Sequence, residues 1–196
     1  MPVAMCIDPG FSRSGVVFID VAADSLVHFA LVETERSSKK SNVRGADDFA
    51  ERSMLMFREL TRLMCDQCPD ALIVEMPTLG AKSASAMRAL SLASGIISSF
   101  IESTGLPYER VTPDAVKKAL CGSRTASKSQ MCDAAAKLHP QLRKAYASKR
   151  SADGWGGDFE HVADAVGVYM AAKSGSLVRL LAMRPRTRNI TNDLTL

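Results

Sequence analysis

The sequence lacks the features of a membrane or secreted protein. No uninterrupted apolar run reaches the ~18 residues that a bilayer-spanning helix needs, and the first residues enter a strand-like segment that leaves no room for a signal peptide. The five cysteines are an odd, scattered set, unlike a disulfide framework. There is also no internal repeat or low-complexity block. These absences predict a protein that is not secreted and that resides in a reduced compartment, the cytoplasm or an organelle matrix.

A second pair of metal ligands is also missing. Cys65 and Cys68 form a single CxxC near a predicted helix end, and a structural zinc site would need two more ligands at suitable spacing. Half-buried helix residues are the ordinary interpretation of this pair, with metal or redox use as the minor alternative.

The positive charge is concentrated in one part of the chain. Of the 196 residues, 46% are hydrophobic and 23% charged, which is typical of one globular domain. Residues 1–100 carry 10 Lys/Arg and 12 Asp/Glu, a net charge of −2, whereas residues 101–196 carry 15 and 9, a net charge of +6. Within residues 117–150, nine basic residues accompany one acid, Asp133. This segment predicts a polyanionic partner, most often nucleic acid; a merely solvated basic face is the alternative.

The order of predicted strands and helices indicates an α/β fold. Short apolar segments predict strands over residues 3–8, 15–20, 26–32, 71–75 and 107–111. Helical spacing and capping signals predict helices over residues 47–65, 82–102, from 113, over 128–138 and 159–173, and from 176. Residues 139–158 are expected to be a basic, glycine-rich loop. Three meandering strands followed by strand–helix alternation predict one mixed sheet with helices on both faces.

Three carboxylates stand in otherwise apolar surroundings. Asp8 follows Cys6 and Ile7 at the end of the first strand, and Glu75 ends the apolar run "ALIVE". Asp164 lies in "EHVADAVGVYM", three residues after His161 and therefore on the same helix face. Brought together, these acids would repel one another, since a carboxylate loses solvation in such places.

Hard divalent cations would relieve this repulsion. Mg²⁺ prefers a few carboxylates together with water and phosphate oxygens, and two such ions can clamp an in-line phosphoryl displacement. The basic segment supports this hypothesis, because a phosphodiester substrate would need both features. Gly10 and Gly15 are expected to let the chain turn sharply after the first strand.

Four sequence blocks resemble the RuvC family of Holliday-junction resolvases. They are "IDPGFSRSG", "IVEMP", "VTPDAVKKALCG…ASKSQM" and "HVADAVG", in the family's order and at comparable spacing across residues 3–172. The resemblance implies a ribonuclease-H-like fold with a five-stranded mixed sheet, a homodimer, and symmetric nicking of four-way DNA junctions with Mg²⁺ or Mn²⁺, two ions per active site. It also implies a nuclease domain over residues 1–175, followed by a C-terminal helix and basic tail over 176–196, in a cytoplasmic (bacterial or phage) or organellar relative.

The resemblance assigns roles to individual residues. Asp8, Glu75 and Asp164 match the family's catalytic, metal-binding acids, and His161 falls at the fourth position, with Glu160 as a nearby substitute. The predicted DNA-binding residues are Lys82, Lys117, Lys118, Arg124 and Lys128. Residues 82–102 correspond to the family's dimer helix.

The chain departs from the family pattern after the glutamate. An aromatic wedge is frequent there, whereas this chain has "MPTLGAK", with Met76 or Leu79 as possible wedges. Three alternatives stay open: an actin-like kinase or ATPase, which needs two such domains and a longer chain; another nuclease of the same fold; or a non-catalytic protein that holds branched DNA.

Overall fold

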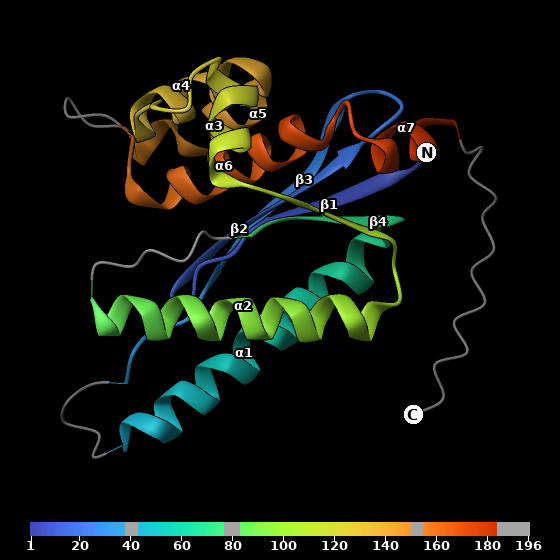
Figure 1. The fold of residues 1–196 in the computed structure, drawn as a ribbon. Coiled ribbons are helices and arrows are strands. Elements are labelled where there is room, and N and C mark those ends of the chain that lie inside the picture. Colours follow the sequence, from blue (N-terminus) through green and yellow to red (C-terminus); the bar gives the residue numbers. More distant parts are fainter. Residues whose placement is uncertain (38–42, 77–82, 150–154, 184–196) are drawn as a thin grey trace.

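The protein forms one mixed five-stranded sheet between two layers of helices (Figure 1). The computed structural model describes residues 1–37, 43–76, 83–149 and 155–183. The strand order is β3-β2-β1-β4-β5, in which β1 pairs antiparallel with β2 and parallel with β4. The strands are β1 (Val3–Asp8), β2 (Arg13–Asp20), β3 (Ser25–Glu33), β4 (Ala71–Glu75) and β5 (Tyr108–Val111). The predicted ribonuclease-H-like fold class is confirmed.

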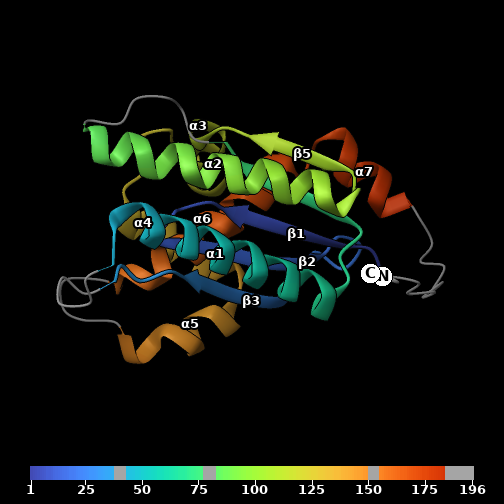
Figure 2. The same ribbon diagram turned by 90° about the horizontal axis from the view of Figure 1, so that it is seen from below.

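Helices cover both faces of the sheet, as predicted. Helices α1 (Gly45–Gln67) and α2 (Ala84–Thr104) lie side by side on one face, as seen in Figure 2. The other face carries α6 (Gly157–Ala172), against which α3 (Pro113–Cys121) and α4 (Lys128–Leu138) pack. The remaining helices are α5 (Pro140–Tyr146), a 3₁₀ turn (Ala147–Lys149) and α7 (Ser176–Met183).

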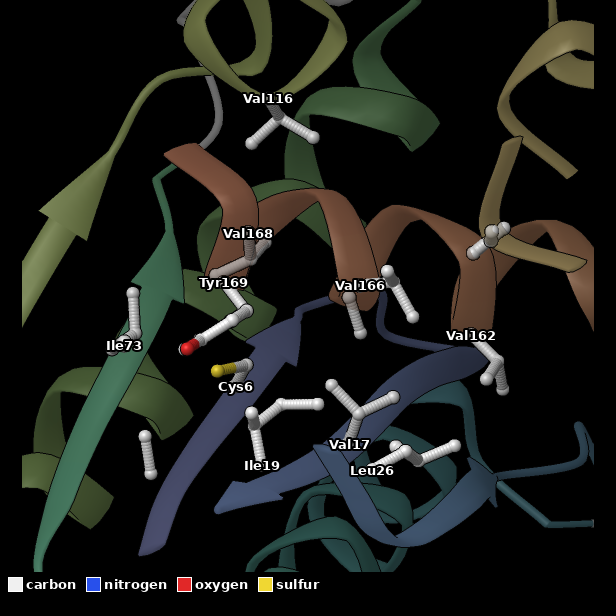
Figure 3. Packing of buried hydrophobic residues seen from close by; sticks show 14 of the residues in the cluster. Cys6, Val17, Ile19, Leu26, Ile73, Val116, Val162, Val166, Val168 and Tyr169 are labelled. Atoms are coloured by element: carbon white, nitrogen blue, oxygen red, sulfur yellow. The ribbon is translucent and has the colours of Figure 1, made fainter. Parts of the chain in front are cut away.

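Strand β1 is buried on both faces and divides the core in two. Ala4 and Cys6 belong to the core beneath α6, whereas Met5 and Ile7 belong to the core beneath α1 and α2. This alternation follows from the two-residue period of a strand. Figure 3 shows Tyr169 of α6 pointing toward Cys6. The same period directs Asp8, two residues after Cys6, toward α6.

Side-chain caps begin the two helices that carry predicted DNA-binding lysines. The Ala115 backbone N–H donates to Thr112 Oγ1 at the start of α3, over 3.3 Å. Ser127 and Gln130 form a complete capping box at the start of α4. Both helix starts were predicted from capping signals in the sequence. The caps set the position of Lys117 within α3 and of Lys128 as the first residue of α4.

The prediction of a loop over residues 139–158 is wrong for its first part. Pro140 occupies the first turn of α5, a position that suits proline, and a 3₁₀ turn follows the helix. Leu142 and Tyr146 lie one helical turn apart and are both buried. This apolar pair, rather than the basic residues between them, decides the local structure.

The CxxC cysteines are exposed rather than half-buried. Cys65 lies in α1, and Cys68 ends this helix in the left-handed conformation. Both are free thiols, and the Cys68 thiol contacts the Cys65 carbonyl oxygen at 3.2 Å.

Helix α2 bears on the expectation that no apolar run is long enough to span a membrane. By length and composition alone it could cross a membrane, with a mean hydropathy of 1.3 and 22% of its apolar window buried. Its serines and small residues interrupt the apolar run without lowering the mean hydropathy much. Such a helix is a weak indication of a span, and its buried side chains, Ala93, Ile97, Phe100 and Ile101, pack in the protein core.

Helix α7 packs on the core beneath α6. Its residues Val178 and Leu181 are buried there. The predicted domain boundary at residue 175 stays a prediction.

Candidate active site

Two of the predicted acids end neighbouring parallel strands. Ile7 of β1 pairs with Val74 of β4, so that Asp8 and Glu75 follow at the same edge of the sheet, on strands ~4.8 Å apart. Since Cys6 and Ile73 both face α6, the carboxylates two residues later are directed to that face as well. The parallel pairing therefore brings together two acids that are far apart in sequence.

Gly15 brings α6 against this edge. It lies inside β2, opposite Asp8, and a Cβ atom placed there would stand 1.9 Å from the His161 carbonyl oxygen. The expectation that Gly15 serves a sharp turn is wrong, because this residue is part of the strand and has no positive φ. Its missing side chain instead lets the helix backbone approach the sheet.

This close approach places His161 beside Asp8. The His161 Nδ1 atom lies 3.2 Å from Asp8 Oδ2, and both side chains are largely shielded from solvent. Asp164, one helical turn further, shares the same face of α6. The structure thus brings the predicted His161–Asp164 pair to the strand ends that carry Asp8 and Glu75.

The acids influence one another's protonation. Burial, together with the charges of Asp8 and Asp164, raises the pKa of Glu75 to about 8, while Lys117 opposes this rise. Burial and the charge of Asp8 raise the pKa of Asp164 to about 7, against the opposing effect of His161. Near neutral pH, Glu75 and Asp164 therefore hold protons part of the time.

The pKa of His161 is raised, which favours the cationic form of its imidazole. Its hydrogen bond with Asp8 and the nearby carboxylates raise its pKa, although burial acts against this. The protonated imidazole is thus one source of positive charge that compensates the acids.

Glu160 lies beside the same group. Its Oε1 atom accepts a hydrogen bond from Lys128 Nζ over 2.7 Å and stands 3.8 Å from His161 Nε2. The Lys128 side chain is 77% exposed, so its contact with Glu160 is a surface ion pair at the rim of the site. His161 and its sequence neighbour Glu160 therefore both border the site, and the helix register does not force a choice between them.

The predicted DNA-binding residues differ in their placement. Lys117 on α3 is half-buried and acts on the charge of Glu75, whereas Lys118 and Arg124 are exposed. Lys82 and Leu79 lie outside the described residues. Met76, the other candidate wedge, is partly buried against the core beneath α1 and α2.

The donor set fits a hard divalent cation. Asp8, Glu75 and Asp164 supply carboxylate oxygens, and the raised pKa values of Glu75 and Asp164 mark an excess of negative charge that a cation would compensate. Among the residues that the structure describes, no three His, Cys, Asp or Glu side chains are close enough to form a complete ligand set. Here Asp8 is hydrogen-bonded to His161 instead.

A buried arginine near the site was missed at the sequence level. Arg52 on α1 is 8% exposed and reaches the segment that follows Asp8. The only available signal was the spacing of Asp48 and Arg52, four residues apart on one helix, which is also common on solvated helix faces.

Comparisons with known proteins agree with the observed fold and identify the family. The family model "Crossover junction endodeoxyribonuclease RuvC" matches residues 4–153. The RuvC of Trichlorobacter lovleyi is 30% identical over 127 residues, which cover 64% of this chain and 66% of that relative, just under two thirds of its length. The RuvC of Parvibaculum lavamentivorans is 31% identical over 134 residues, covering 67% of this chain and 72% of the relative.

Solved structures share the fold at lower sequence identity. Thermus thermophilus RuvC in complex with a Holliday junction substrate has a TM-score of 0.63 and 21% identity, over 87% of this chain and 92% of that one. The yeast mitochondrial Holliday junction resolvase has a TM-score of 0.58 and 10% identity, over 91% and 81% of the two chains. Together with the family match over most of its length, these findings show that the chain belongs to the RuvC family of crossover junction endodeoxyribonucleases.

Proposed function

We propose that the protein is a Holliday-junction resolvase, an endonuclease that nicks four-way DNA junctions symmetrically by metal-dependent phosphodiester hydrolysis. The observation that carries this proposal is the contact of His161 with Asp8, together with the charge interactions among Asp8, Glu75 and Asp164 at the ends of β1 and β4. Family membership makes endonuclease activity the expected chemistry of such a site.

The four residues would hold the metal. Bound to Asp8, Glu75, Asp164 and His161, a pair of Mg²⁺ or Mn²⁺ ions would supply positive charge for the phosphate and an activated water. These side chains are carried by two strands and one helix rather than by loops, so the backbone that directs their donor atoms is regular.

The surrounding cations would bind the DNA backbone. The charge of Lys117 opposes the rise in the pKa of Glu75, which supports a role for this lysine near the candidate metal-binding acids. Lys128 is exposed at the rim and is free to exchange Glu160 for a phosphate oxygen. Lys118 and Arg124 are exposed and extend the positive surface available to the junction arms, and Lys82 stays a predicted DNA-binding residue.

Helices α1 and α2 support the proposal of a homodimer. Between them lies a groove of about 440 Å³ lined by apolar and small side chains, among them Met54, Phe57, Leu92 and Ile96. Met54 is 57% exposed, and Gly95 lets a second helix approach closely. A dimer through this face would suit a substrate with two symmetric cleavage positions.

The bacterial origin of the sequence relatives supports a cytoplasmic location for this protein. We also propose that residues 1–175 form the nuclease unit.

A cleavage assay on four substrates tests the function. A synthetic four-way junction, a duplex, a single strand and an RNA–DNA hybrid are each incubated with Mg²⁺, Mn²⁺ or EDTA. We expect paired, symmetric nicks in the junction alone, and only with metal. Preferential cleavage of the hybrid would instead indicate a ribonuclease, and binding without cleavage of any substrate would indicate a non-catalytic junction-binding protein.

The variant Asp8→Asn separates binding from chemistry. It removes a ligand charge and keeps the side-chain shape, so junction binding is expected to persist while cleavage is lost. Asp66→Asn, at an exposed position of α1 that does not line the apolar groove, is the matched control and should cleave as the unmodified protein does. Full cleavage by Asp8→Asn would remove Asp8 from the site.

A further inference from the structure

A buried arginine contacts the short loop that joins the candidate metal-binding strand to its neighbour. The loop spans residues 9–12, between the end of β1 at Asp8 and the start of β2. Arg52 Nη2 donates a hydrogen bond to Ser12 Oγ over 2.9 Å, and the guanidinium carbon lies 4.4 Å from the centre of the Phe11 ring. Two consecutive loop residues are therefore in direct contact with one side chain of α1.

Thr34, just beyond β3, connects the same arginine to the loop backbone. Arg52 donates to Thr34 Oγ1 over 3.1 Å and to the Thr34 carbonyl oxygen over 3.3 Å. Thr34 in turn donates through its hydroxyl to the Phe11 carbonyl oxygen over 2.5 Å, and through its backbone N–H to the Ser12 carbonyl oxygen over 3.0 Å. The loop is thus held by its backbone as well as by its side chains.

The charge of Arg52 is balanced inside the protein. Asp48 Oδ2 lies 3.5 Å from Arg52 Nη1, and the two side chains are 8% and 9% exposed. A buried ion pair of this kind is a weak source of net stability, because desolvation offsets much of the attraction. The planar guanidinium nevertheless fixes the directions of several hydrogen bonds at once, which a lysine does not do.

Movement of this loop would be transmitted to Asp8. Ser14 links the loop to β2 through Gly10, whose N–H donates to Ser14 Oγ over 3.1 Å, while the same hydroxyl donates to the Gly10 carbonyl oxygen over 2.9 Å. Between this link and Asp8 only Pro9 intervenes, and its ring restricts the backbone. The anchored loop therefore begins directly after the residue that carries the Asp8 carboxylate.

We propose that Arg52 is a positioning residue for the metal centre: through Ser12, Phe11 and Thr34 it fixes the loop after β1 and so orients Asp8 for divalent cations. This inference rests on the proposed function. Arg52 is buried on α1, on the face of the sheet opposite α6, and would therefore act through the loop rather than by direct contact with metal or DNA.

Metal binding without DNA tests the inference directly. Mn²⁺ is titrated into the full-length metal-free protein and followed by electron paramagnetic resonance of the free ion. Arg52→Lys keeps the positive charge but loses the planar guanidinium and its several hydrogen-bond donors. We expect the Mn²⁺ affinity of this variant to fall about tenfold, the usual scale for residues that orient a metal ligand. The melting temperature of the metal-free variant should stay close to that of the unmodified protein, and saturating Mn²⁺ should restore most of its cleavage rate.

The matched control is Arg58→Lys, an exposed arginine on the same helix, which should bind Mn²⁺ normally. Ser12→Ala keeps the inference testable if the arginine variant fails to fold, because it removes only one hydroxyl and should also weaken Mn²⁺ binding. The double variant should bind no more weakly than Arg52→Lys alone, since both changes break the same contact.

Normal Mn²⁺ affinity in Arg52→Lys and in Ser12→Ala would overturn the inference, and so would fully additive losses in the double variant. Failure of the unmodified protein to nick a junction would overturn the proposed function instead. The two failures are distinguishable, because the first concerns only the variants and the second concerns the unmodified protein.

Discussion

Replacing Glu75 with glutamine should stabilise the metal-free protein at alkaline pH while abolishing cleavage. Burial and the charges of Asp8 and Asp164 raise the pKa of Glu75 from 4.5 to about 8 in the folded state. A pKa that is higher in the folded state means that folding favours the protonated form. The resulting contribution to stability is present below pH 4.5 and is lost as the pH rises toward 8.

The size of the effect follows from this pKa difference. At 1.36 kcal/mol per pKa unit, the change from 4.5 to about 8 corresponds to a ceiling of about 5 kcal/mol. Glu75 is only partly buried at the edge of the sheet, where solvent screens its charge, and we expect about 2 kcal/mol to be realised. In a protein of this size this corresponds to a melting temperature about 4–8 °C higher for Glu75→Gln at pH 8.5.

Thermal unfolding followed by circular dichroism in EDTA, from pH 5 to pH 9, measures this difference. At pH 5 the folded protein holds Glu75 protonated and most of the contribution remains, so the two melting temperatures should differ least there. Added Mg²⁺ should stabilise the unmodified protein more than the variant, because it binds the folded state through the carboxylate. The exposed control variant Asp66→Asn should show no such pH dependence. A constant difference between Glu75→Gln and the unmodified protein at all pH values would refute the reasoning.

Three further predictions concern the site and its approach to the helix. Lys117→Ala and Lys128→Ala should reduce junction cleavage, and each should reduce the salt dependence of binding by about one released counterion. Arg179→Ala, at an exposed position of α7, should do neither. Equal effects of all three variants in binding titrations would indicate a diffuse electrostatic role. His161→Asp should retain cleavage and His161→Ala should lose most of it at an unchanged melting temperature; an active alanine variant would direct attention to Glu160. Gly15→Ala should destabilise the protein by at least about 2 kcal/mol, since its Cβ would collide with backbone of α6, and an unchanged melting temperature would contradict that packing.

The sequence alone determined the local structure around the site. The two-residue period of β1 and β4 directs their even- and odd-numbered residues to opposite faces, and Asp8 and Glu75 stand out because each ends an apolar strand. Thr112 and Ser127 mark the starts of α3 and α4, because capping depends on residues only three positions apart. His161 and Asp164 are recognisable as a pair for the same reason.

Only the tertiary structure decided how these pieces meet. The pairing of β1 with β4 crosses a long stretch of chain, and no local period specifies the register that brings Glu75 beside Asp8. The contact of α6 with the sheet depends on Gly15. From the sequence alone, a glycine that allows close helix approach looks the same as a glycine that allows a turn. Helix α5 was missed because it lies in a segment, residues 139–158, that is basic and glycine-rich as a whole, while two apolar residues of the helix decide its burial.

Arg52 shows most clearly what a sequence leaves open. A charged residue on an amphipathic helix is normally exposed, and here it is buried because Ser12, Thr34 and Asp48 supply hydrogen bonds and a counter-charge. These partners come from a loop, from the end of a strand and from the helix itself. Local patterns specify which face a side chain takes, whereas the compensation of a buried charge depends on groups that only the folded chain brings within hydrogen-bonding distance.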